Sequence, residues 1–448
     1  MEMKNENVVN DNDPKIMTVL GPIQGEDLGW VLMNEHLVCD EALAKKKQQQ
    51  QGTSSSSSIT LENLHTIRRH PWPHGFNTMP SNSSTIDEEL KPLLQQISKT
   101  ATNPRDNNKK VVAATILDVT SVDEGRNHKA VQTLAKRLGS NTTVQIIMGT
   151  TCEASSTTDD PKDKDKYLKK QIARMEQELL YGIDFDFDKD ATGSTDIVRA
   201  GFIGQLALSS PVPTQHEWQQ LKACAMVQGS TKAPLIVGVP EPSSPPSRQI
   251  ILEIIQTLET FNGGNLQSRT VLSHMDLYHK DVELIETVLD KGHCIGLDRY
   301  SLAYSVLNLD SIYPTIHNVI TMLQTLLAKN PAYVHQIVLS AGIEMKLQYQ
   351  KYGGPGYAIV WDLIERLIQT NTLTRAQLDT VLTENPRKLL QWWTPPPEPT
   401  KPIEYLECSV CKKMFEPILG QYYTKYAFTY CGRECLTKHR LAKFKPID

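Results

Sequence analysis

Short apolar runs alternate with amphipathic stretches from about residue 111 onward. Apolar runs of this length without polar alternation are typical of parallel strands that are buried on both faces. They are VVAATILDV (111–119), VQIIMG (144–149), IVRAGFIGQL (197–206), APLIVGV (233–239), TVLSH (270–274), CIGLD (294–298) and QIVLSA (336–341). Apolar residues at three- and four-residue steps predict helices between them. These stretches are 130–138, 217–228, 248–259, 281–291 and 316–328.

An earlier apolar run from Trp30 to Leu37 adds an eighth strand to this pattern. Eight strands that alternate with helices favour an α/β fold of the (β/α)₈ TIM-barrel type, with a doubly wound open sheet as the alternative. The sequence Thr374-Arg-Ala-Gln377 predicts a capping box at the start of the last helix. We therefore expect a barrel over residues 15–393, preceded by a flexible N-terminus over residues 1–14.

Three low-complexity segments interrupt the alternation of strands and helices. They lie at 45–58, 150–166 and 240–247 and are rich in serine, lysine, glutamine or proline. Such compositions cannot bury a core, so we expect these segments to be mobile or to become ordered on a partner. Each follows a predicted strand, which would place it at the C-terminal mouth of the barrel as flexible filler or as a docking loop.

A proline-rich linker at 394–402 separates the barrel from the last segment, residues 403–448, and favours an extended spacer. This segment contains Cys408-Ser-Val-Cys411 and Cys431-Gly-Arg-Glu-Cys435, with nineteen residues between the two pairs. Two short cysteine pairs with such a gap suit a tetrahedral zinc site. Four thiolates leave no open position, so the zinc would be structural and not catalytic. The complete cysteine set makes His439 a surface residue rather than a ligand.

Composition narrows the classes of function. The 448 residues are 39% hydrophobic and 22% charged, as in ordinary soluble proteins. A net charge of −4 argues against wholesale nucleic-acid binding, although residues 408–448 hold eight Lys or Arg against three Asp or Glu. No apolar run approaches the roughly 20 residues that span a bilayer, and the polar start resembles neither a signal nor a transit peptide. The scattered Cys39, Cys152, Cys224 and Cys294 are then reduced thiols, so we expect an intracellular and most simply cytoplasmic protein.

Nine sequence blocks, taken in order, resemble the phosphotriesterase-related proteins of the amidohydrolase superfamily. They are TVLGPIQGEDLGWVLMNEHL (18–37), DVTSVDEGRN (118–127), ELLYGID (178–184), RAGFIGQLALSSP (199–211), APLIV (233–237), SHMD (273–276), GLD (296–298), KYGGPGY (351–357) and ENPRKLL (384–390). This resemblance covers about residues 15–393. It implies a (β/α)₈ barrel and, in typical members, a two-zinc site that hydrolyses esters, amides, lactones or phosphotriesters.

The last segment resembles the treble-clef zinc fingers of the MYM/TRASH type. In these fingers an aromatic residue precedes the third ligand and a helix follows it. Here Tyr430 precedes Cys431, and TKHRLAKF (437–444) predicts the helix. The second cysteine pair would then lie at a helix N-terminus, where the helix dipole favours a thiolate.

The resemblance to phosphotriesterase-related proteins also implies where barrel metal ligands would lie. The six matching positions are Asn34, His36, Gln205, Gly238, His274 and Gly342. Four of them have lost the family's histidine, bridging lysine or glutamate, or aspartate, and only the two histidines remain. An amide is a weak zinc ligand and a glycine side chain offers none, so we expect no dinuclear centre in the barrel.

A rebuilt site for one zinc ion at the same mouth is an alternative hypothesis. His36, His274 and Glu344, with Asp276 or Cys39 nearby, would give zinc two imidazoles and an acid while leaving one position open. Otherwise the two histidines hydrogen-bond within a polar core. No G-x-S-x-G nucleophile motif occurs in the sequence.

These patterns favour a catalytically degenerate barrel that acts as a structural or partner-binding subunit of a larger protein assembly. One structural zinc in the C-terminal finger would make that finger a docking element. Two alternatives stay open. The first is a metal-dependent hydrolase of esters, amides or lactones with the rebuilt mononuclear site, and the second is a nucleic-acid-associated factor that acts through the finger.

Overall fold

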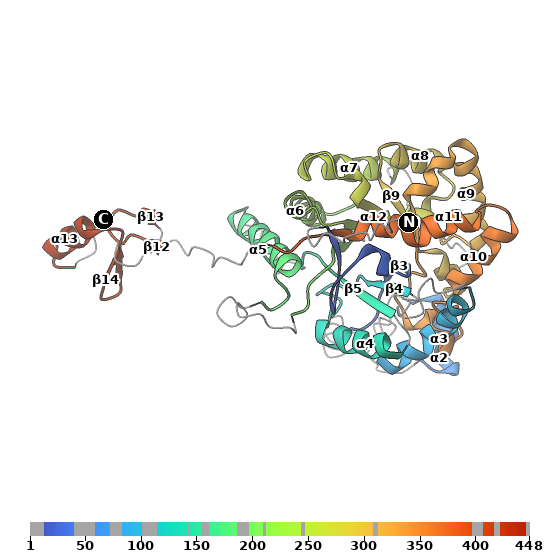
Figure 1. Cartoon of the computed structure of the whole chain (residues 1–448). Helices are drawn as coiled ribbons and strands as arrows, with labels where there is room; N and C mark the ends of the chain where they lie inside the picture. Colours follow the sequence, from blue (N-terminus) through green and yellow to red (C-terminus); the bar gives the residue numbers. More distant parts are fainter. Residues whose placement is uncertain are drawn as a thin grey trace, which may run out of the picture. The chain divides into compact units, whose positions relative to one another are not determined.

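The computed structural model describes most of the chain. The described ranges are 13–39, 59–71, 83–100, 114–141, 144–153, 161–185, 197–208, 212–242, 247–307, 312–396, 406–415 and 422–444. The chain divides into two compact units, and their boundary lies between Pro395 and Pro396 (Figure 1). Within these ranges, every helix is too short or too polar to cross a membrane.

Eight parallel strands form the centre of the larger unit. They are β3 (Trp30–Glu35), β4 (Ala114–Asp118), β5 (Val144–Thr150), β6 (Phe202–Ala207), β7 (Leu235–Gly238), β8 (Thr270–Ser273), β9 (Cys294–Leu297) and β10 (Ile337–Leu339). Hydrogen bonds join them in chain order from β3 to β10. Because each strand lies beside its predecessor without a switch in order, the sheet curls into a nearly closed barrel. The predicted (β/α)₈ fold is confirmed, and the doubly wound alternative is wrong.

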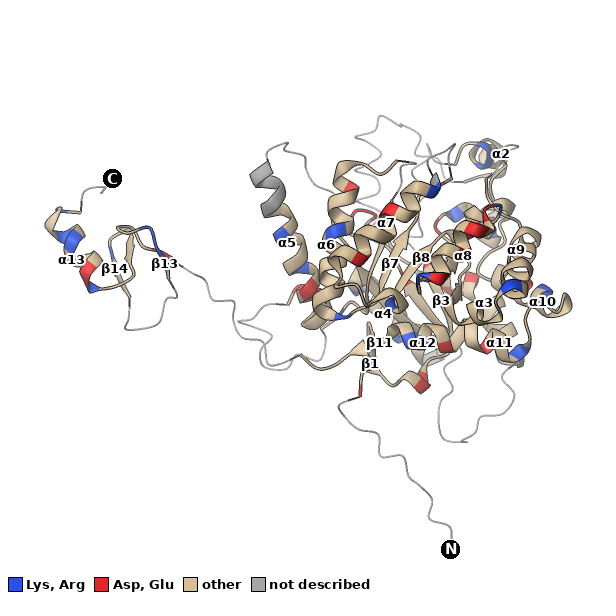
Figure 2. Cartoon of the chain, turned by 90° about the horizontal axis from the view of Figure 1, so that it is seen from above, with Lys and Arg blue, Asp and Glu red and all other residues tan. Residues whose placement is uncertain are grey.

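Helices surround the barrel, and the charged residues lie mainly on them rather than on the strands (Figure 2). The helices are α2 (Leu61–Arg69), α3 (Ser83–Thr100), α4 (His128–Asn141), α5 (Pro161–Leu180), α6 (Gln215–Thr231), α7 (Ser247–Phe261), α8 (Val282–Asp290), α9 (Ile316–Lys329), α10 (Ile359–Gln369), α11 (Arg375–Asp379) and α12 (Asn385–Leu390). Short 3₁₀ segments follow several strands, among them Met275–Tyr278 and Tyr300–Tyr304. The predicted capping box at Thr374 is present, since its side chain accepts a hydrogen bond from the backbone N–H of Gln377.

A small antiparallel sheet joins the two chain ends of this unit. Its strands are β1 (Lys15–Thr18), β2 (Gly21–Ile23) and β11 (Gln391–Trp393), in the order β11-β1-β2. Trp392 anchors the sheet to the barrel by donating an indole N–H to the carbonyl oxygen of Gly201 over 2.7 Å. The sequence pattern did not predict this sheet, because three- and four-residue strands carry little periodic signal.

A buried carboxylate helps to close the barrel between its edge strands β3 and β10. Glu35, at the end of β3, is fully buried and accepts hydrogen bonds from the Ser340 hydroxyl and from the backbone N–H groups of residues 341–343, over 2.7–3.2 Å. The backbone N–H of Asn34 also donates to Ser340 Oγ over 2.8 Å. Burial raises the pKa of Glu35 to about 8, although these donors act in the opposite direction. The turn after β10 therefore folds around one side chain of β3.

The three predicted low-complexity segments have different outcomes. Residues 45–58 lie outside the described residues, as do 243–246 of the third segment, and helix α7 begins at Ser247. The second prediction is partly wrong, because β5 includes Thr150 and α5 begins at Pro161, inside 150–166. Leu168, Ile172, Met175 and Leu179 recur at helical spacing and pack against the core, which extends the helix back through its charged first turns.

The smaller unit consists of two short hairpins and a helix. Its elements are β12 (Leu406–Glu407), β13 (Met414–Phe415), β14 (Tyr423–Lys425), β15 (Phe428–Tyr430) and α13 (Arg433–Leu441). The helix begins four residues before its predicted start at residue 437. His439 is buried, not a surface residue as predicted, because it packs on Phe428 at 4.7 Å between ring centroids and its Nδ1 lies 3.0 Å from the Tyr430 hydroxyl. In so small a unit, an imidazole is part of the core.

Candidate functional site

The six positions that the resemblance implies as metal ligands lie in strands or shortly after them, towards the C-terminal mouth of the barrel. Asn34 lies in β3 and His36 follows it, while Gln205 lies in β6 and Gly238 ends β7. His274 and Gly342 follow β8 and β10. Because the carboxyl ends of all parallel strands meet at one face, the fold alone brings these positions to the same mouth.

His274 forms hydrogen bonds through both ring nitrogens, and its contacts define its tautomer. Burial lowers the pKa of His274 and the Arg299 charge lowers it further, so the ring is neutral at neutral pH. Its Nδ1 then donates to Asp298 over 2.8 Å. Its Nε2 faces the amide nitrogen of Gln205 at 3.2 Å and an Arg299 guanidinium nitrogen at 3.0 Å. The Nε2 lone pair, which a metal ligand would use, therefore accepts hydrogen bonds from these two groups.

Asp298 directly follows the seventh barrel strand, β9, and is the acceptor at the centre of this network. One carboxylate oxygen accepts from the ring and the backbone N–H of His274, at 2.8 and 3.0 Å. The other accepts from the side-chain amide of Asn34 over 2.8 Å and from the Ser273 hydroxyl. Burial alone would raise the pKa of Asp298, but the imidazole, Arg299 and the Ser273 hydroxyl hold it below the usual range. Both oxygens of the ionised group are thus already engaged.

Arg299 is the cation of the mouth. Its guanidinium forms an ion pair with Glu344 at 2.6 Å, and the two side chains are only 17% and 18% exposed. Burial would raise the pKa of Glu344, but the guanidinium holds it below its ordinary value. A guanidinium carries its charge at all physiological pH values and is fixed by two directional hydrogen bonds. Arg299 therefore supplies at this mouth a positive charge that needs no bound ion.

The two glycine positions leave little room for the side chains that the family carries there. A Cβ at Gly238 would lie 2.8 Å from His274 Nε2 and 3.0 Å from Cδ of Gln205. Gly342 has φ +63°, and a Cβ there would overlap the backbone carbonyl oxygen of Asp298. Neighbouring atoms occupy the space beside both glycines. A histidine or an aspartate at either position would therefore fit only if these atoms moved.

The remaining residues of the rebuilt-site hypothesis point to other partners. Nδ1 of His36 lies 3.4 Å from the Thr120 hydroxyl and 4.0 Å from a Glu124 carboxylate oxygen. Asp276 accepts from the backbone N–H of Arg299 over 2.8 Å, and burial together with the nearby Asp298 charge raises its pKa to about 7. Cys39 forms an isolated backbone bridge with Arg126. Across the described ranges, the cysteine cluster of the C-terminal unit is the only group of three or more potential ligand atoms within 4.8 Å of one another.

The donor set of the mouth does not fit two divalent ions. Such a centre needs a bridging anion and several imidazole or carboxylate ligands with free lone pairs. At the bridging position Gln205 is a neutral amide that hydrogen-bonds to His274, and the acid Glu344 is neutralised by Arg299. Sequence reasoning missed Arg299 and the role of Asp298, although a charged pair directly after an apolar run was a usable signal.

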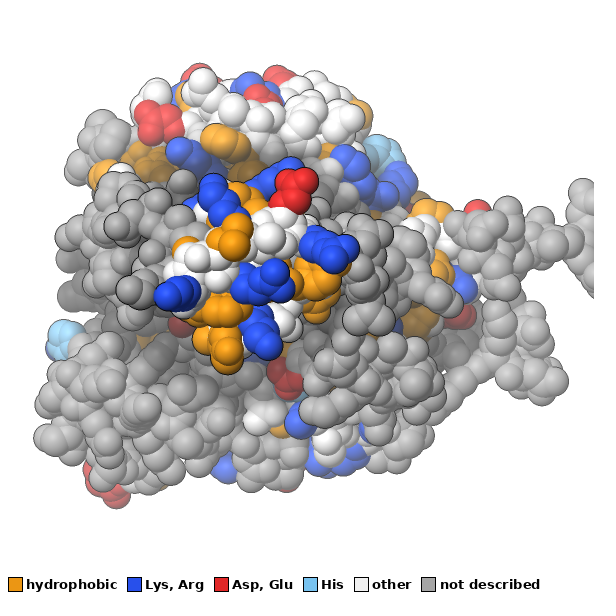
Figure 3. Space-filling model, turned by 90° about the vertical axis from the view of Figure 1, so that its left-hand side faces the viewer, with side chains coloured by type: hydrophobic (Ala, Val, Ile, Leu, Met, Phe, Trp, Pro, Cys, Tyr) orange, Lys and Arg blue, Asp and Glu red, His pale blue; other side chains and the backbone are white. Residues whose placement is uncertain are grey.

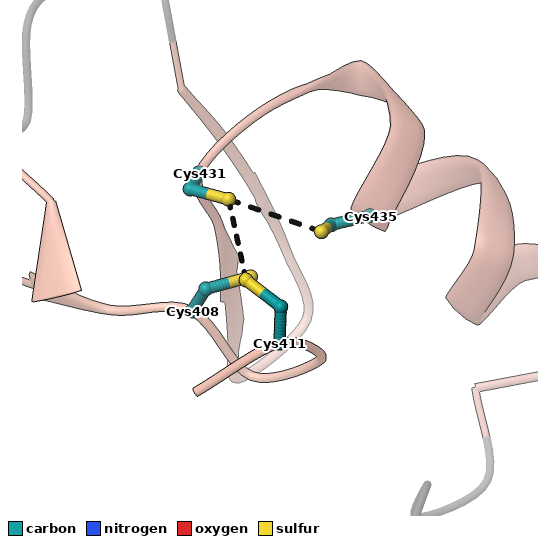
Figure 4. A group of neighbouring side chains, drawn as sticks. All are labelled: Cys408, Cys411, Cys431 and Cys435. Carbon is teal, nitrogen blue, oxygen red and sulfur yellow. Dashed lines mark hydrogen bonds between the residues drawn. The ribbon is translucent and has the colours of Figure 1, made fainter. Parts of the chain in front are cut away.

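The C-terminal unit contains a cluster that does fit a metal ion. The sulfur atoms of Cys408, Cys411, Cys431 and Cys435 all lie within 4.8 Å of one another (Figure 4). Cys411 and Cys431 are 3.6 Å apart and Cys431 and Cys435 are 3.8 Å apart. The first pair lies on the turn between β12 and β13, and the second pair lies just before and inside the first turn of α13. The sequence predicted these four residues and their convergence.

Electrostatics in the cluster require a cation if all four sulfurs are to be thiolates. Burial would raise the pKa of Cys408, but the backbone N–H groups of Cys411, Cys431 and Val410 lower it to about 6. Burial and the neighbouring sulfurs raise the pKa of Cys435 to about 12. Four mutually repelling thiolates cannot form together without positive charge between them, and a tetrahedral zinc ion supplies it. The four residues would hold zinc with no position left for substrate.

Comparison with known families matches each unit separately. The model of the phosphotriesterase family matches residues 14–390. The model of the Vms1-associating treble clef domain matches residues 403–447. The first match covers the whole barrel with the mouth described above, and the second contains all four cysteines.

Individual proteins give the same picture for the barrel. A phosphotriesterase-related protein from Nematostella vectensis is 30% identical over 383 residues, which are 83% of this chain and 97% of that protein. An N-acetyltaurine hydrolase from Danio rerio is 26% identical over 380 residues, 84% of this chain and 97% of that protein. Among solved structures, a resiniferatoxin-binding protein from Rhodobacter sphaeroides has a TM-score of 0.64 and 25% identity and covers 86% of this chain and 98% of its own. A lactonase from Listeria monocytogenes, at TM-score 0.59 and 18% identity over 85% of this chain and all of its own, shares the fold.

Proposed function

Since this chain belongs to the phosphotriesterase family, we propose that it is a member whose barrel has lost metal-dependent hydrolysis. In this proposal the barrel serves as a structural or partner-binding subunit of a larger protein assembly. The C-terminal unit binds one structural zinc ion through Cys408, Cys411, Cys431 and Cys435 and acts as the docking element.

One observation carries the proposal for the barrel. His274, a retained family ligand, uses Nδ1 to hydrogen-bond Asp298 and Nε2 to accept from Gln205 and Arg299. A guanidinium within 3.0 Å of Nε2 repels a divalent ion at the position where the ion would bind this nitrogen. Metal binding would have to break these hydrogen bonds and the Arg299–Glu344 ion pair. The free energy of metal binding would then be too small to hold an ion at a site that also lacks a bridging anion.

The C-terminal unit supports a role in assembly. It lies outside the region that matches the phosphotriesterase family, and it matches a domain described as associating with Vms1. A closed four-cysteine site organises a small fold without offering chemistry. A unit of this kind next to a barrel without a metal site suits recruitment better than catalysis.

The metal content of the full-length protein tests the proposal. We expect about one zinc ion per chain, retained in His274→Ala and lost in Cys435→Ser. Purified protein should also hydrolyse N-acetyltaurine and simple lactones no faster than the uncatalysed background rate. Two or more bound metal ions per chain, together with turnover that His274→Ala abolishes, would overturn the proposal.

A second candidate function is a hydrolase with a rebuilt mononuclear site. It is favoured by relatives named N-acetyltaurine hydrolases, which match the barrel over nearly their full length. The mouth also holds acids outside the family ligand set, and Asp276 with its pKa of about 7 is one of them. In this case a second equivalent of zinc should bind the wild-type chain, and Glu344→Gln should remove that equivalent while leaving the cysteine-bound ion in place.

A further inference from the structure

Positive charge accumulates on the surface of the C-terminal unit. Its described residues hold seven Lys or Arg, all exposed, against two glutamates. Figure 3 shows basic side chains interspersed with hydrophobic ones on this unit. Basic side chains alone are common on a solvated surface, but this surface also exposes apolar side chains. Tyr426 and Leu441 are 77% and 78% exposed, which is unusual for side chains that a small unit needs for its core.

Phe444 links these two apolar residues, because its ring contacts Tyr426 and it follows Leu441 by three residues. The ring of Tyr426 contacts Phe444 edge-on, with 5.2 Å between ring centroids, and the Lys425 ammonium lies 5.3 Å from the Tyr426 ring. Phe444 ends the turn that follows Leu441 at the end of α13, and Lys443 in that turn donates its backbone N–H to the carbonyl of Arg440 over 3.0 Å. We call this surface the basic corner and define it as Lys425, Tyr426, Arg440, Leu441, Lys443 and Phe444.

The composition of the basic corner favours a protein ligand over a nucleic acid. A base stacks on an open aromatic face. Tyr426 is the only largely exposed ring among the described aromatic residues of this unit, and the Lys425 ammonium lies 5.3 Å from its centroid, so successive bases would find no second open ring on which to stack. Leu441 is aliphatic and cannot stack, but it can bury a hydrophobic side chain. Aromatic and aliphatic residues surrounded by Lys and Arg are complementary to a segment that carries both acidic and hydrophobic side chains.

We propose that the basic corner is the docking surface for an acidic protein segment with a hydrophobic anchor residue. The anchor packs on Tyr426 and Leu441, and its flanking carboxylates pair with Lys425, Arg440 and Lys443. This inference rests on the proposed docking role of the C-terminal unit and adds the chemistry of the partner. It is independent of whether the barrel hydrolyses a substrate.

Binding of defined probes to the full-length, zinc-loaded chain tests the inference. The probes are a labelled Glu-rich peptide of about twelve residues with a central Phe, the same peptide with a central Gly, and a uridine oligonucleotide of similar charge. We expect the Phe peptide to bind at least about tenfold more tightly than the Gly peptide, since one buried aromatic side chain is worth about a tenfold change or more. Leu441→Ser should reduce this preference to about threefold or less.

Two charge-reversed double variants locate the surface. Lys425→Glu with Lys443→Glu should weaken the Phe peptide about tenfold or more, whereas Lys412→Glu with Lys413→Glu, which changes the charge equally on the cysteine knuckle, should weaken it less than about threefold. Each variant must retain its zinc equivalent, so that weaker binding reports on the basic corner and not on an unfolded zinc site. Absence of peptide binding by the zinc-loaded wild-type chain refutes the basic corner and leaves the proposed zinc site untouched. The inference is overturned by equal effects of the two double variants, by absence of peptide binding, or by tighter binding of the oligonucleotide.

Discussion

The barrel mouth and the C-terminal unit both gather residue types that bind metals, but they satisfy these residues differently. At the mouth His274, Asp298, Arg299 and Glu344 form hydrogen bonds and an ion pair with one another. In the C-terminal unit the four cysteine sulfurs converge to within 4.8 Å of one another, as the ligands of one ion would. The first set is complete without metal, and the second is not.

This difference follows from the size of the two hydrophobic cores. The barrel buries a continuous apolar cluster across its strands and helices, so its fold does not require a metal ion at the mouth. The C-terminal unit buries few side chains, among them Cys408, Tyr430 and His439. A unit with so little core needs a metal ion or a disulfide to fold. A barrel without a bound metal ion is therefore expected to stay folded, whereas loss of one cysteine is expected to unfold the finger.

Removal of the zinc is expected to have the largest effect. Cys435→Ser, or a strong chelator, should unfold the C-terminal unit, because structural zinc sites contribute about 10 kcal/mol or more to folding at neutral pH. Limited proteolysis should then cut residues 406–444 rapidly while the barrel stays intact. The exposed Thr437→Ser, on the same helix, is the matched control and should leave the protease resistance unchanged. Resistance retained by the zinc-free protein would show that the unit does not need the metal.

Removal of the cation at the mouth is expected to have the next largest effect. Arg299→Met leaves the buried Glu344 without its partner, and breaking one half of such a pair destabilises proteins by about 3–5 kcal/mol. Adding Glu344→Gln should recover part of this loss, because the unpaired charge is removed. The measurement is the free energy of unfolding by urea at pH 7.

The exposed pair of Arg248 and Asp281 offers a control for the same substitution. Their side chains are 48% and 38% exposed, and Nη1 of Arg248 lies 3.4 Å from Oδ1 of Asp281. Arg248→Met should therefore lower the free energy of unfolding by less than about 1 kcal/mol. Equal losses in the two single variants would show that the Arg299 ion pair is not screened from water, and the contrast between mouth and surface would fail.

Much of the fold followed from the sequence because buried parallel strands leave a strong local signal. The unalternated run at 233–239 predicted β7 (Leu235–Gly238), and the periodic stretch 316–328 predicted α9 (Ile316–Lys329). The sheet of β1, β2 and β11 was missed, since its strands gain their stability from pairing distant segments and not from local pattern. Helix α5 was not predicted, because the composition of 150–166 outweighed the apolar face that begins at Leu168.

The candidate sites divide in the same way. Cysteine spacing identified the four sulfurs, since two local pairs on one short chain segment can meet in few ways. The mouth network could not be derived, because Arg299 touches His274 and Glu344, which are each tens of residues away in the chain. Glu35 gave no signal of its own within the block at 18–37, because its role in barrel closure depends on a turn more than 300 residues later.

A comparison of two glycines sharpens the claim that the mouth has closed. Gly342 and Gly353 both have positive φ, +63° and +78°, but only a Cβ at Gly342 would meet other atoms, namely the backbone of Asp298. Gly353→Ala should cost about 1 kcal/mol from backbone strain alone. Gly342→Ala should cost about 3 kcal/mol, because a backbone overlap adds to the strain. Thermal unfolding of the two variants measures the difference, and equal losses would mean that the turn after β10 can relax.

The smallest expected effect concerns the pH dependence of the barrel, which separates it from the zinc unit. The pKa of Glu35 is about 8 in the folded protein and 4.5 in the unfolded chain, so between these values the folded state binds an extra proton. Stability from this group is therefore complete below about pH 4.5 and is lost as the pH rises towards 8, by about 2 kcal/mol between about pH 5.5 and about pH 7.5.

Glu35→Gln should lower stability overall, since an amide cannot accept from all the donors that surround this side chain. It should also flatten the dependence of the free energy of unfolding on pH, by the equivalent of about one bound proton. Asp276 contributes a slope of the same sign, and buried histidines such as His293 contribute the opposite sign below about pH 6.5, so the comparison must be made between wild type and variant. The exposed Glu253→Gln is the control and should leave the slope unchanged.

Zinc binding by the cysteines strengthens as pH rises, because protons leave the thiols. Opposite pH trends in barrel unfolding and zinc retention would therefore support the contrast, and a Glu35→Gln slope identical to wild type would show that this carboxyl is ionised throughout.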